Sequence, residues 1–379
     1  MSDSDVTVAH AADFDRFLAT DHLVWFDEPD NLSTDEQLVG VPPEQRFAAD
    51  RPGAEPGTYP GIYGVRPMQL SVPAATGGRL VPMAGLTWVG VHPDHRRRGV
   101  LSAMVRHHLE QTHREGVALS CLHASEPVIY GRYGYGLASQ SATLSVGRGA
   151  TFTAPGLDQD ARAVETRLAT ETGDDLVSRT RECELRVAAA LPGSVVGDEG
   201  FYRAVLRETP EKLRGKEPRR MLFASRDGVD VGLAAFRRLH KWEQHRPQGT
   251  VEVAALLGEP AVRLALLRRL VDLDLMATVK LPEVAVDDPI WQWVGPRSAG
   301  DVIPADNLWV RIVDLPAALP LRSYAAACDV VVDVVDPHAP WQAGRWRIVV
   351  ADGEGRAERT DADADTELPV AALGAAYLG

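Results

Sequence analysis

The chain has 379 residues, and this length predicts two or three domains. Hydrophobic residues make up 45% of the chain and charged residues 25%, the ordinary balance of a soluble globular protein, which excludes a wholly disordered, collagen-like or membrane-embedded chain. The formal net charge of -13 disfavours long-range attraction to nucleic acid or to an anionic bilayer, and it favours cationic partners instead.

The cysteines and the N-terminal residues indicate the cellular compartment of the protein. Cys121, Cys183 and Cys328 are too few and too scattered for a disulfide framework, which fits a reducing, cytosolic environment. The chain begins Met-Ser-Asp-Ser-Asp, with neither a basic nor an apolar segment, so we expect no secretory signal. No apolar run approaches the ~18 residues that span a bilayer. We therefore predict a cytoplasmic protein without a membrane span.

Turn-forming residues dominate the first part of the chain. Prolines recur between residues 29 and 60 and leave little room for long helices there. Alternating apolar residues then predict a strand over Ile62–Val72, and Leu86–Val91 predicts a second strand, which Pro93 ends.

The hydrophobic period changes after Gly99. Apolar residues recur there at helical spacing up to Gly116, which has the character of a helix C-cap, and Val117–Leu122 then predicts a short strand. Residues 86–122 therefore predict the order strand, basic turn, helix, strand.

The same order recurs later in the chain. Thr250–Leu257 predicts a strand, Glu259-Pro260 opens a helix with one apolar face, and Met276–Leu281 predicts the closing strand. The two units lie about 165 residues apart, which indicates a duplicated domain rather than a short-period solenoid. The second unit lacks the arginine-rich turn, so we expect any ligand of that turn to bind to the first unit alone.

A third region begins near Trp291. Asn307–Val313 and Arg345–Val350 predict strands, and Asp352-Gly353 predicts a hairpin turn. The acidic run from residue 352 to 367 is expected to be a solvated hairpin edge rather than a cation site.

The strongest functional signal is the segment from Val89 to Leu101, with the sequence VGVHPDHRRRGVL. A strand ends at a proline, a basic turn follows, and Gly99 precedes a helix. Helix N-termini bind phosphates through free N–H groups and a partial positive charge, and arginines add forked donors. This arrangement favours a phosphate site over a solvated basic loop.

This segment resembles the acyl-CoA signature Arg/Gln-x-x-Gly-x-Gly/Ala of the GNAT acetyltransferase superfamily, with Leu101 at the last position. Together with LHASE at 122–126 and IYGRYGYG at 129–136, it is similar to one branch, the Eis (enhanced intracellular survival) type N-acetyltransferases. The resemblance covers most of the chain, since it extends through Val262–Leu275, Leu308–Leu315 and Ala371–Gly379.

The resemblance implies an α/β (α+β) fold with two tandem GNAT-like domains followed by a sterol-carrier-protein-like domain. In this sequence we place the N-terminal GNAT domain at 1–149, a degenerate second one at 150–290 and the third domain at 291–379. It also implies a homo-hexamer, with acetyl-CoA as co-substrate. The acetyl-CoA-binding residues that it implies are Val89, Val91, Arg96, Arg97, Gly99, Val100, Ser125 and Glu126.

The implied chemistry is attack of an amine on the thioester carbonyl. Backbone N–H groups of a strand can hold the oxyanion, and a tyrosine hydroxyl can protonate the departing thiolate. The resemblance identifies Tyr130 as this general acid, while Tyr133 and Tyr135 in the same run are competing candidates. In the family the carboxylate at the chain's C-terminus acts as general base. Because this sequence stops at Gly379 after an apolar segment, we expect a tail beyond it that packs into the first domain's cleft.

Two further groups of residues could form a binding site, one for an amine and one for a metal. Trp25, Asp27 and Glu28 combine aromatic surface with acid where the family places part of its amine pocket, and carboxylates there would attract cationic amines. His92 and His95 have metal-ligand spacing, but Pro93 breaks the helix that would align them, so we expect no metal site.

The leading prediction is an acetyl-CoA-dependent N-acetyltransferase that acts on cationic amines: aminoglycoside-like polyamines, lysine side chains or small diamines. One alternative is an acyltransferase that uses longer acyl-CoAs. The other is a non-catalytic scaffold that binds acyl-CoA or lipid through the third domain. The sequence does not name the physiological amine, because GNAT substrate pockets are built from variable loops.

Overall fold

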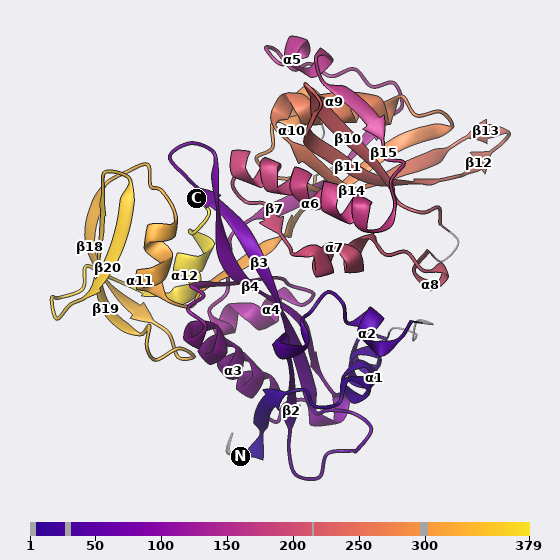
Figure 1. Ribbon diagram of the computed structural model, residues 1–379. Helices are drawn as coiled ribbons and strands as arrows, with labels where there is room; N and C mark the ends of the chain where they lie inside the picture. The colour runs from indigo at the N-terminus through magenta and orange to yellow at the C-terminus, as the bar shows by residue number, and fades with distance from the viewer. Residues whose placement is uncertain (1–4, 27–31, 214–215, 296–301) are drawn as a thin grey trace.

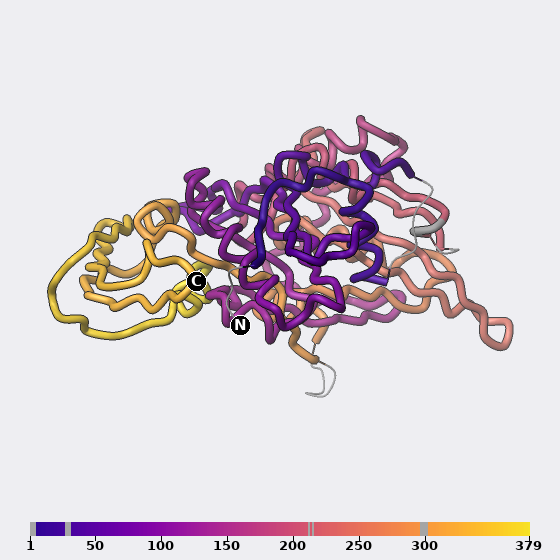
Figure 2. Tube along the Cα trace, turned by 90° about the horizontal axis from the view of Figure 1, so that it is seen from below, coloured from indigo at the N-terminus to yellow at the C-terminus, as the bar shows by residue number. Residues whose placement is uncertain are grey.

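The computed structural model describes residues 5–26, 32–213, 216–295 and 302–379. Helices flank three principal sheets, which confirms the predicted mixed α/β class. The first domain lies at the bottom of Figure 1, the second at the upper right and the third at the left. Seen from below, in Figure 2, the third domain extends to one side of the other two.

The first sheet has the strand order β1-β2-β3-β4-β5-β17-β6, with β9 paired to β3. Because side chains alternate along a strand, Phe47 and Tyr63 pack against α3 on one face, whereas Ala48 and Ile62 pack with Phe17 of α1 on the other. The elements are β1 (Thr7–His10), α1 (Phe14–Trp25), α2 (Thr34–Gln37), β2 (Arg46–Asp50), β3 (Gly61–Pro73), β4 (Gly78–Val91), α3 (Val100–Arg114), β5 (Leu119–His123), α4 (Pro127–Tyr130), β6 (Gly136–Leu137), β9 (Val195–Val196) and β17 (Leu308–Ile312).

The second sheet has the order β16-β7-β15-β14-β11-β10-β8. Its two faces are covered by α9 and by α6, which buries Cys183 against Met221 and Leu233. The elements are β7 (Gln140–Gly147), α5 (Asp158–Arg162), β8 (Glu165–Leu168), α6 (Gly173–Ala190), α7 (Glu199–Leu206), α8 (Pro210–Leu213), β10 (Arg220–Arg226), β11 (Val229–Leu239), the ribbon β12 (Trp242–Glu243) and β13 (Arg246–Pro247), β14 (Gly249–Gly258), α9 (Pro260–Val271), β15 (Met276–Ala285), α10 (Ile290–Trp293) and β16 (Pro304–Asp306).

The third sheet has the order β20-β19-β18-β21, and it shares a buried core with the first domain. Val332 and Trp346 of the third sheet belong to the same cluster as Leu70 and Val310 of the first. Helix α12 packs closely on β17, since a Cβ on Gly374 of α12 would lie 2.2 Å from the carbonyl oxygen of Val310. The elements are α11 (Leu315–Ala318), β18 (Cys328–Val335), β19 (Gly344–Ala351), β20 (Glu354–Arg359), β21 (Thr366–Pro369) and α12 (Val370–Ala375).

Both predicted strand–helix–strand units are confirmed. β4, α3 and β5 form the first, and β14, α9 and β15 form the second, with parallel strands in each. Glu259 is the N-cap of α9 and Pro260 its first residue, as their positions in the sequence predict. The hairpin turn at Asp352-Gly353 is also confirmed, and the acidic run beyond it begins on β20, an edge strand.

The first two sheets exchange strands. β7 follows the first GNAT-like segment but pairs with β15 and β16 in the second sheet, and β17 follows the second segment but lies between β5 and β6 in the first. The exchange crosses the boundaries that we placed at 149/150 and 290/291. Neither sheet is therefore complete without strands from the other side of a boundary. No helix within the described ranges is both long and apolar enough to cross a membrane.

Candidate active site

The site begins where β4 and β5 separate. These parallel strands pair only at Ala84 with Ser120 and at Gly85 with Cys121, so their carboxyl-terminal halves diverge. β4 also carries a bulge, since its register against β3 shifts between Ile62 and Gly64. Trp88 has a φ of 50° there, a conformation that costs energy and is typical of functional sites. A bulge takes backbone N–H groups out of the ladder, so donors become available beside Val89.

The basic turn leads directly into α3. Arg97 has a φ of 59° and Gly99 a φ of 81°, and these left-handed residues turn the chain into the helix. Gly99 is the N-cap and supplies no side-chain acceptor, so the first N–H groups of α3 keep their hydrogen-bonding capacity. The side chains of Arg96 and Arg97 are exposed and make no hydrogen bond or ion pair within the part of the chain that the structure describes. This constellation fits a pyrophosphate.

The three tyrosines of the 130–135 segment differ in what their hydroxyls contact. The Tyr133 hydroxyl lies 3.1 Å from Ser102 Oγ of α3, and the Tyr135 hydroxyl lies 2.8 Å from Ser120 Oγ of β5. The hydroxyl of Tyr130 has no hydrogen-bond partner among the described residues, and this residue lines a cleft. Of the three, Tyr130 is therefore the one whose proton is free for a ligand.

Burial raises the pKa of both Tyr130 and Tyr135. It raises the pKa of Tyr130, with smaller contributions from Glu126 and Tyr133, so the hydroxyl keeps its proton at neutral pH. Burial also raises the pKa of Tyr135, whose ring meets that of Tyr130 edge-on with centroids 5.9 Å apart. Ser120 continues the hydrogen-bond chain from Tyr135 to His108, whose pKa burial lowers to about 3. This series of hydrogen bonds is uncharged and supports the Tyr130 ring from behind.

A cleft of about 830 Å³ lies between the first and second domains. It brings together four of the predicted site residues, namely Trp25, Val89, Ser125 and Tyr130. The other predicted acetyl-CoA residues do not line it: Val91 ends β4, Arg96, Arg97 and Gly99 belong to the turn, Val100 begins α3, and Glu126 is the exposed N-cap of α4. Asp27 and Glu28 lie outside the described residues, so their predicted role stays a prediction.

The cleft also contains groups that sequence reasoning missed. His123 of β5 lines it, as do Glu184 of α6 and Tyr202 of α7. Burial raises the pKa of Glu184 to about 7, only partly offset by the hydrogen bond from Tyr202. One signal was available: Glu184 lies between the buried residues Thr180 and Val187 on the inner face of α6, where a charged residue is unexpected.

A metal centre is not evident. Among the residues that the structure describes, no three His, Cys, Asp or Glu side chains come together as possible ligands. The His92 and His95 rings lie 5.4 Å apart between centroids, and His92 Nδ1 accepts a hydrogen bond from the backbone N–H of Asp94. His92 therefore caps the turn before α3.

Three family models match the chain in the order that the fold displays. An acetyltransferase (GNAT) domain matches residues 9–138, a second acetyltransferase (GNAT) domain matches 193–312, and a sterol carrier protein domain matches 315–379. The second match ends with β17, the strand that lies in the first sheet.

Individual relatives agree with these matches. An uncharacterised N-acetyltransferase of Streptomyces avermitilis is 36% identical over 84% of this chain and 76% of its own length. The N-acetyltransferase Eis of Mycobacterium tuberculosis is 30% identical over 87% of this chain and 78% of its own length. Eis1 of Mycobacterium abscessus superposes with a TM-score of 0.77 at 27% identity, over 99% of this chain and 90% of that one. This chain belongs to the Eis-type N-acetyltransferases of the GNAT superfamily.

Proposed function

We propose that this enzyme transfers the acetyl group of acetyl-CoA to a cationic amine: an aminoglycoside-like polyamine, a lysine side chain or a small diamine. The observation that carries the proposal is the Tyr130 hydroxyl, which has no partner in the described chain and lines the cleft where β4 leaves β5. Cationic acceptors agree with the net charge of -13. We further propose that the enzyme is cytoplasmic and forms a homo-hexamer, as the family resemblance implies.

Acetyl-CoA supplies an activated thioester, and in this proposal the protein holds it at two places. Arg96, Arg97 and the N–H groups at the start of α3 bind the pyrophosphate, because Gly99 leaves that helix end without a side-chain cap. The N–H groups beside Val89 at the β4 bulge bind the thioester oxygen, where negative charge develops during attack. Val91, Val100, Ser125 and Glu126 complete the predicted contacts.

Proton transfers complete the reaction. A C–N bond forms as the C–S bond breaks, the amine loses a proton to a base, and Tyr130 gives its proton to the sulfur. The raised pKa of Tyr130 keeps its hydroxyl protonated until the thiolate leaves and accepts the proton. Following the family resemblance, we propose that a C-terminal carboxylate is the base. His123 is the competing group, since it lines the same cleft.

An amine panel tests the proposal. Purified protein is incubated with acetyl-CoA and, in turn, a small diamine, a blocked lysine and an aminoglycoside, while released thiol is followed. Amine-dependent release is expected. Parallel runs with longer acyl-CoAs distinguish the acyltransferase alternative, since that alternative predicts faster release from the longer chains. If calorimetry shows acyl-CoA binding but no amine causes thiol release, the protein is a binding scaffold and the proposal is wrong.

A further inference from the structure

The second domain contributes the Glu184 carboxylate to the cleft. The reaction described above does not use this carboxylate. Glu184 lies on α6, and its Oε2 accepts a hydrogen bond of 2.6 Å from the hydroxyl of Tyr202 on α7. Tyr202 is itself buried, so this hydrogen bond holds the Glu184 carboxyl group in one orientation at the cleft wall. Oε1 has no protein donor within the described ranges.

No cation in the described part of the chain forms an ion pair with the Glu184 carboxylate. Two arginines of this region have other partners: Arg181 donates to the carbonyl of Gly197, and Arg219 donates to the carbonyl of Val205 and forms an ion pair with Glu208. Arg66 also lines the cleft and lies over the ring of Phe201; its Nε has no hydrogen-bond partner among the described residues, and it forms no ion pair with Glu184. Within the described residues Glu184 takes part in no ion pair. A half-buried carboxylate without a counter-ion is costly, and a cationic ligand would relieve that cost.

Glu184 is remote from the thioester end of the cleft. Tyr202 belongs to a buried cluster against which Leu80 packs, near the start of β4, whereas Val89 lies near the end of that strand. Met83 and Val89 are both cleft residues of β4, and at about 3.3 Å per residue they are separated by at most about 20 Å, because the bulge at Trp88 shortens this stretch. An ammonium group held at Glu184 is therefore not the amine that attacks the thioester.

The cleft wall between these two ends is mostly apolar. Its side chains include Met68, Met83, Leu206, Val253 and Leu257. A hydrocarbon spacer is favoured against such a wall, whereas a polar spacer would lose hydrogen bonds to water.

We infer that Glu184 and Tyr202 form a binding site for the distal ammonium group of a long, two-headed amine, whose other amino group is acetylated beside Tyr130. The inference rests on the proposed function, and it narrows the acceptor class to molecules with two amino groups joined by an extended, largely apolar spacer. Binding of the ammonium group pairs the Glu184 carboxylate with a charge-assisted hydrogen bond, and Tyr202 fixes its orientation.

The test compares α,ω-diamines, from diaminopropane to diaminododecane, with n-alkylamines of the same chain length. The ratio of kcat/KM for each diamine to that of its matched monoamine is expected to rise with chain length, by about 10- to 100-fold for the longest members. Glu184→Gln keeps the shape and an acceptor for Tyr202 but removes the charge, so it should abolish this preference. The kcat/KM of the diamines should fall far more than that of the matched monoamines, which have no distal ammonium group.

Glu182→Gln is the matched control. Glu182 lies on the same helix, is exposed and pairs with Arg186, so the variant should keep the diamine preference. A preference that survives Glu184→Gln, or a wild-type enzyme that treats long diamines and monoamines alike, overturns the inference. Calorimetry with diaminododecane gives the same comparison without turnover. Calorimetry therefore tests the distal site even if the amine panel finds no acetylation. A panel without acetylation would reject the proposed function but not the distal site.

Discussion

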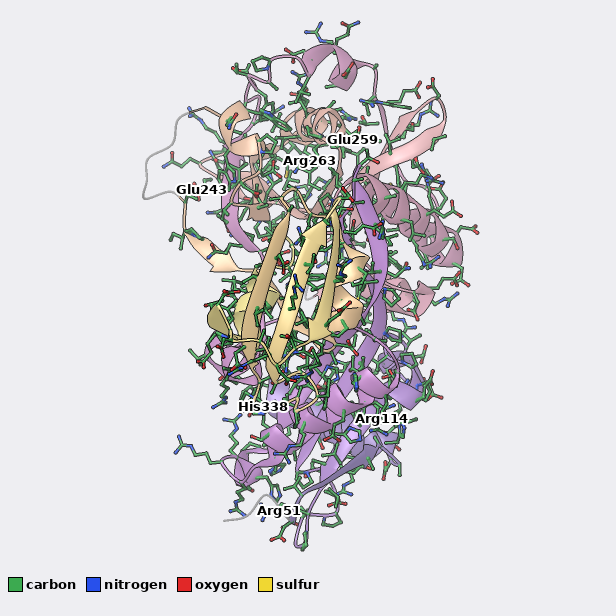
Figure 3. All side chains as sticks on the ribbon, turned by 90° about the vertical axis from the view of Figure 1, so that its left-hand side faces the viewer. Arg51, Arg114, Glu243, Glu259, Arg263 and His338 are labelled. Atoms are coloured by element: carbon green, nitrogen blue, oxygen red, sulfur yellow. The ribbon has the colours of Figure 1, made fainter. Side chains whose placement is uncertain are left out.

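Arg311 and Asp336 form an ion pair in which Nη2 lies 2.6 Å from Oδ2, and neither side chain is exposed. Arg311 lies on β17 in the first sheet and also donates through Nε to the carbonyl of Tyr133 at 3.0 Å. Asp336 directly follows β18 and lies two residues before His338, whose ring nitrogen contacts the carbonyl of Arg132 at 3.0 Å. Figure 3 shows His338 at the end of the third sheet nearest the first domain. The third domain thus holds the segment that carries the candidate acid.

The first prediction concerns this ion pair. Asp336→Asn leaves the guanidinium of Arg311 buried without its counter-charge, so the free energy of unfolding should fall by about 3–5 kcal/mol. Because Arg311 positions the backbone at Tyr133, kcat should also fall more than KM rises. Urea denaturation and steady-state kinetics measure the two effects. Asp329→Asn is the control in the same sheet, since it breaks an exposed pair with Arg347 and should change little.

The second prediction concerns the turn before α3. Gly99→Asp places a side chain at a φ of 81° and a negative charge beside the proposed pyrophosphate site. Calorimetry should show a large loss of acetyl-CoA affinity and little change in amine affinity. Gly156→Asp controls for backbone strain, because Gly156 has a φ of 79° and open space around it. Unchanged acetyl-CoA affinity in Gly99→Asp would show that the pyrophosphate binds elsewhere.

The third prediction concerns the acid. Tyr130→Phe keeps the ring that meets Tyr135 and removes only the hydroxyl, so kcat should fall by roughly 10²–10⁴-fold with acetyl-CoA affinity preserved. Tyr133→Phe is the paired variant. It removes the contact with Ser102 and should cost much less activity. The opposite ranking of the two variants would identify Tyr133 as the acid.

The fourth prediction concerns pH and Glu184. Burial raises the pKa of this carboxyl from 4.5 to about 7, so the folded state binds the proton more tightly than the unfolded chain does. The resulting stabilisation is complete below about pH 4 and is lost as the pH rises to 7. Glu184→Gln removes this dependence. Relative to wild type, the variant should therefore gain about 1–3 kcal/mol between pH 5 and pH 8.

Thermal unfolding at the two pH values measures this difference. Glu182→Gln, at an exposed position on the same helix, should follow the wild-type curve. Equal pH dependence in wild type and Glu184→Gln would mean that the carboxyl is well solvated in the folded protein.

The sequence by itself determined the local units of this fold. Pro93, Gly99 and Gly116 mark the ends of β4 and α3, and the change from alternating to helical spacing lies between them. The same logic located β14, α9 and β15. These features depend on neighbours within a few residues, so periodicity and turn chemistry suffice to predict them. The acyl-CoA motif and the Tyr130 segment were recognisable for the same reason, since each is contiguous in the sequence.

Only the tertiary structure decided which distant segments meet. No local pattern indicates that β17 enters the first sheet or that β7 joins the second, because strand partners are chosen by packing between residues far apart in the chain. The different roles of Tyr130 and Tyr135 arise in the same way. Ser120 of β5 forms a hydrogen bond with the Tyr135 hydroxyl, whereas Tyr130 lines the cleft. Glu184 reaches that cleft because two domains close around it, and its unusual proton affinity follows from the water that they exclude.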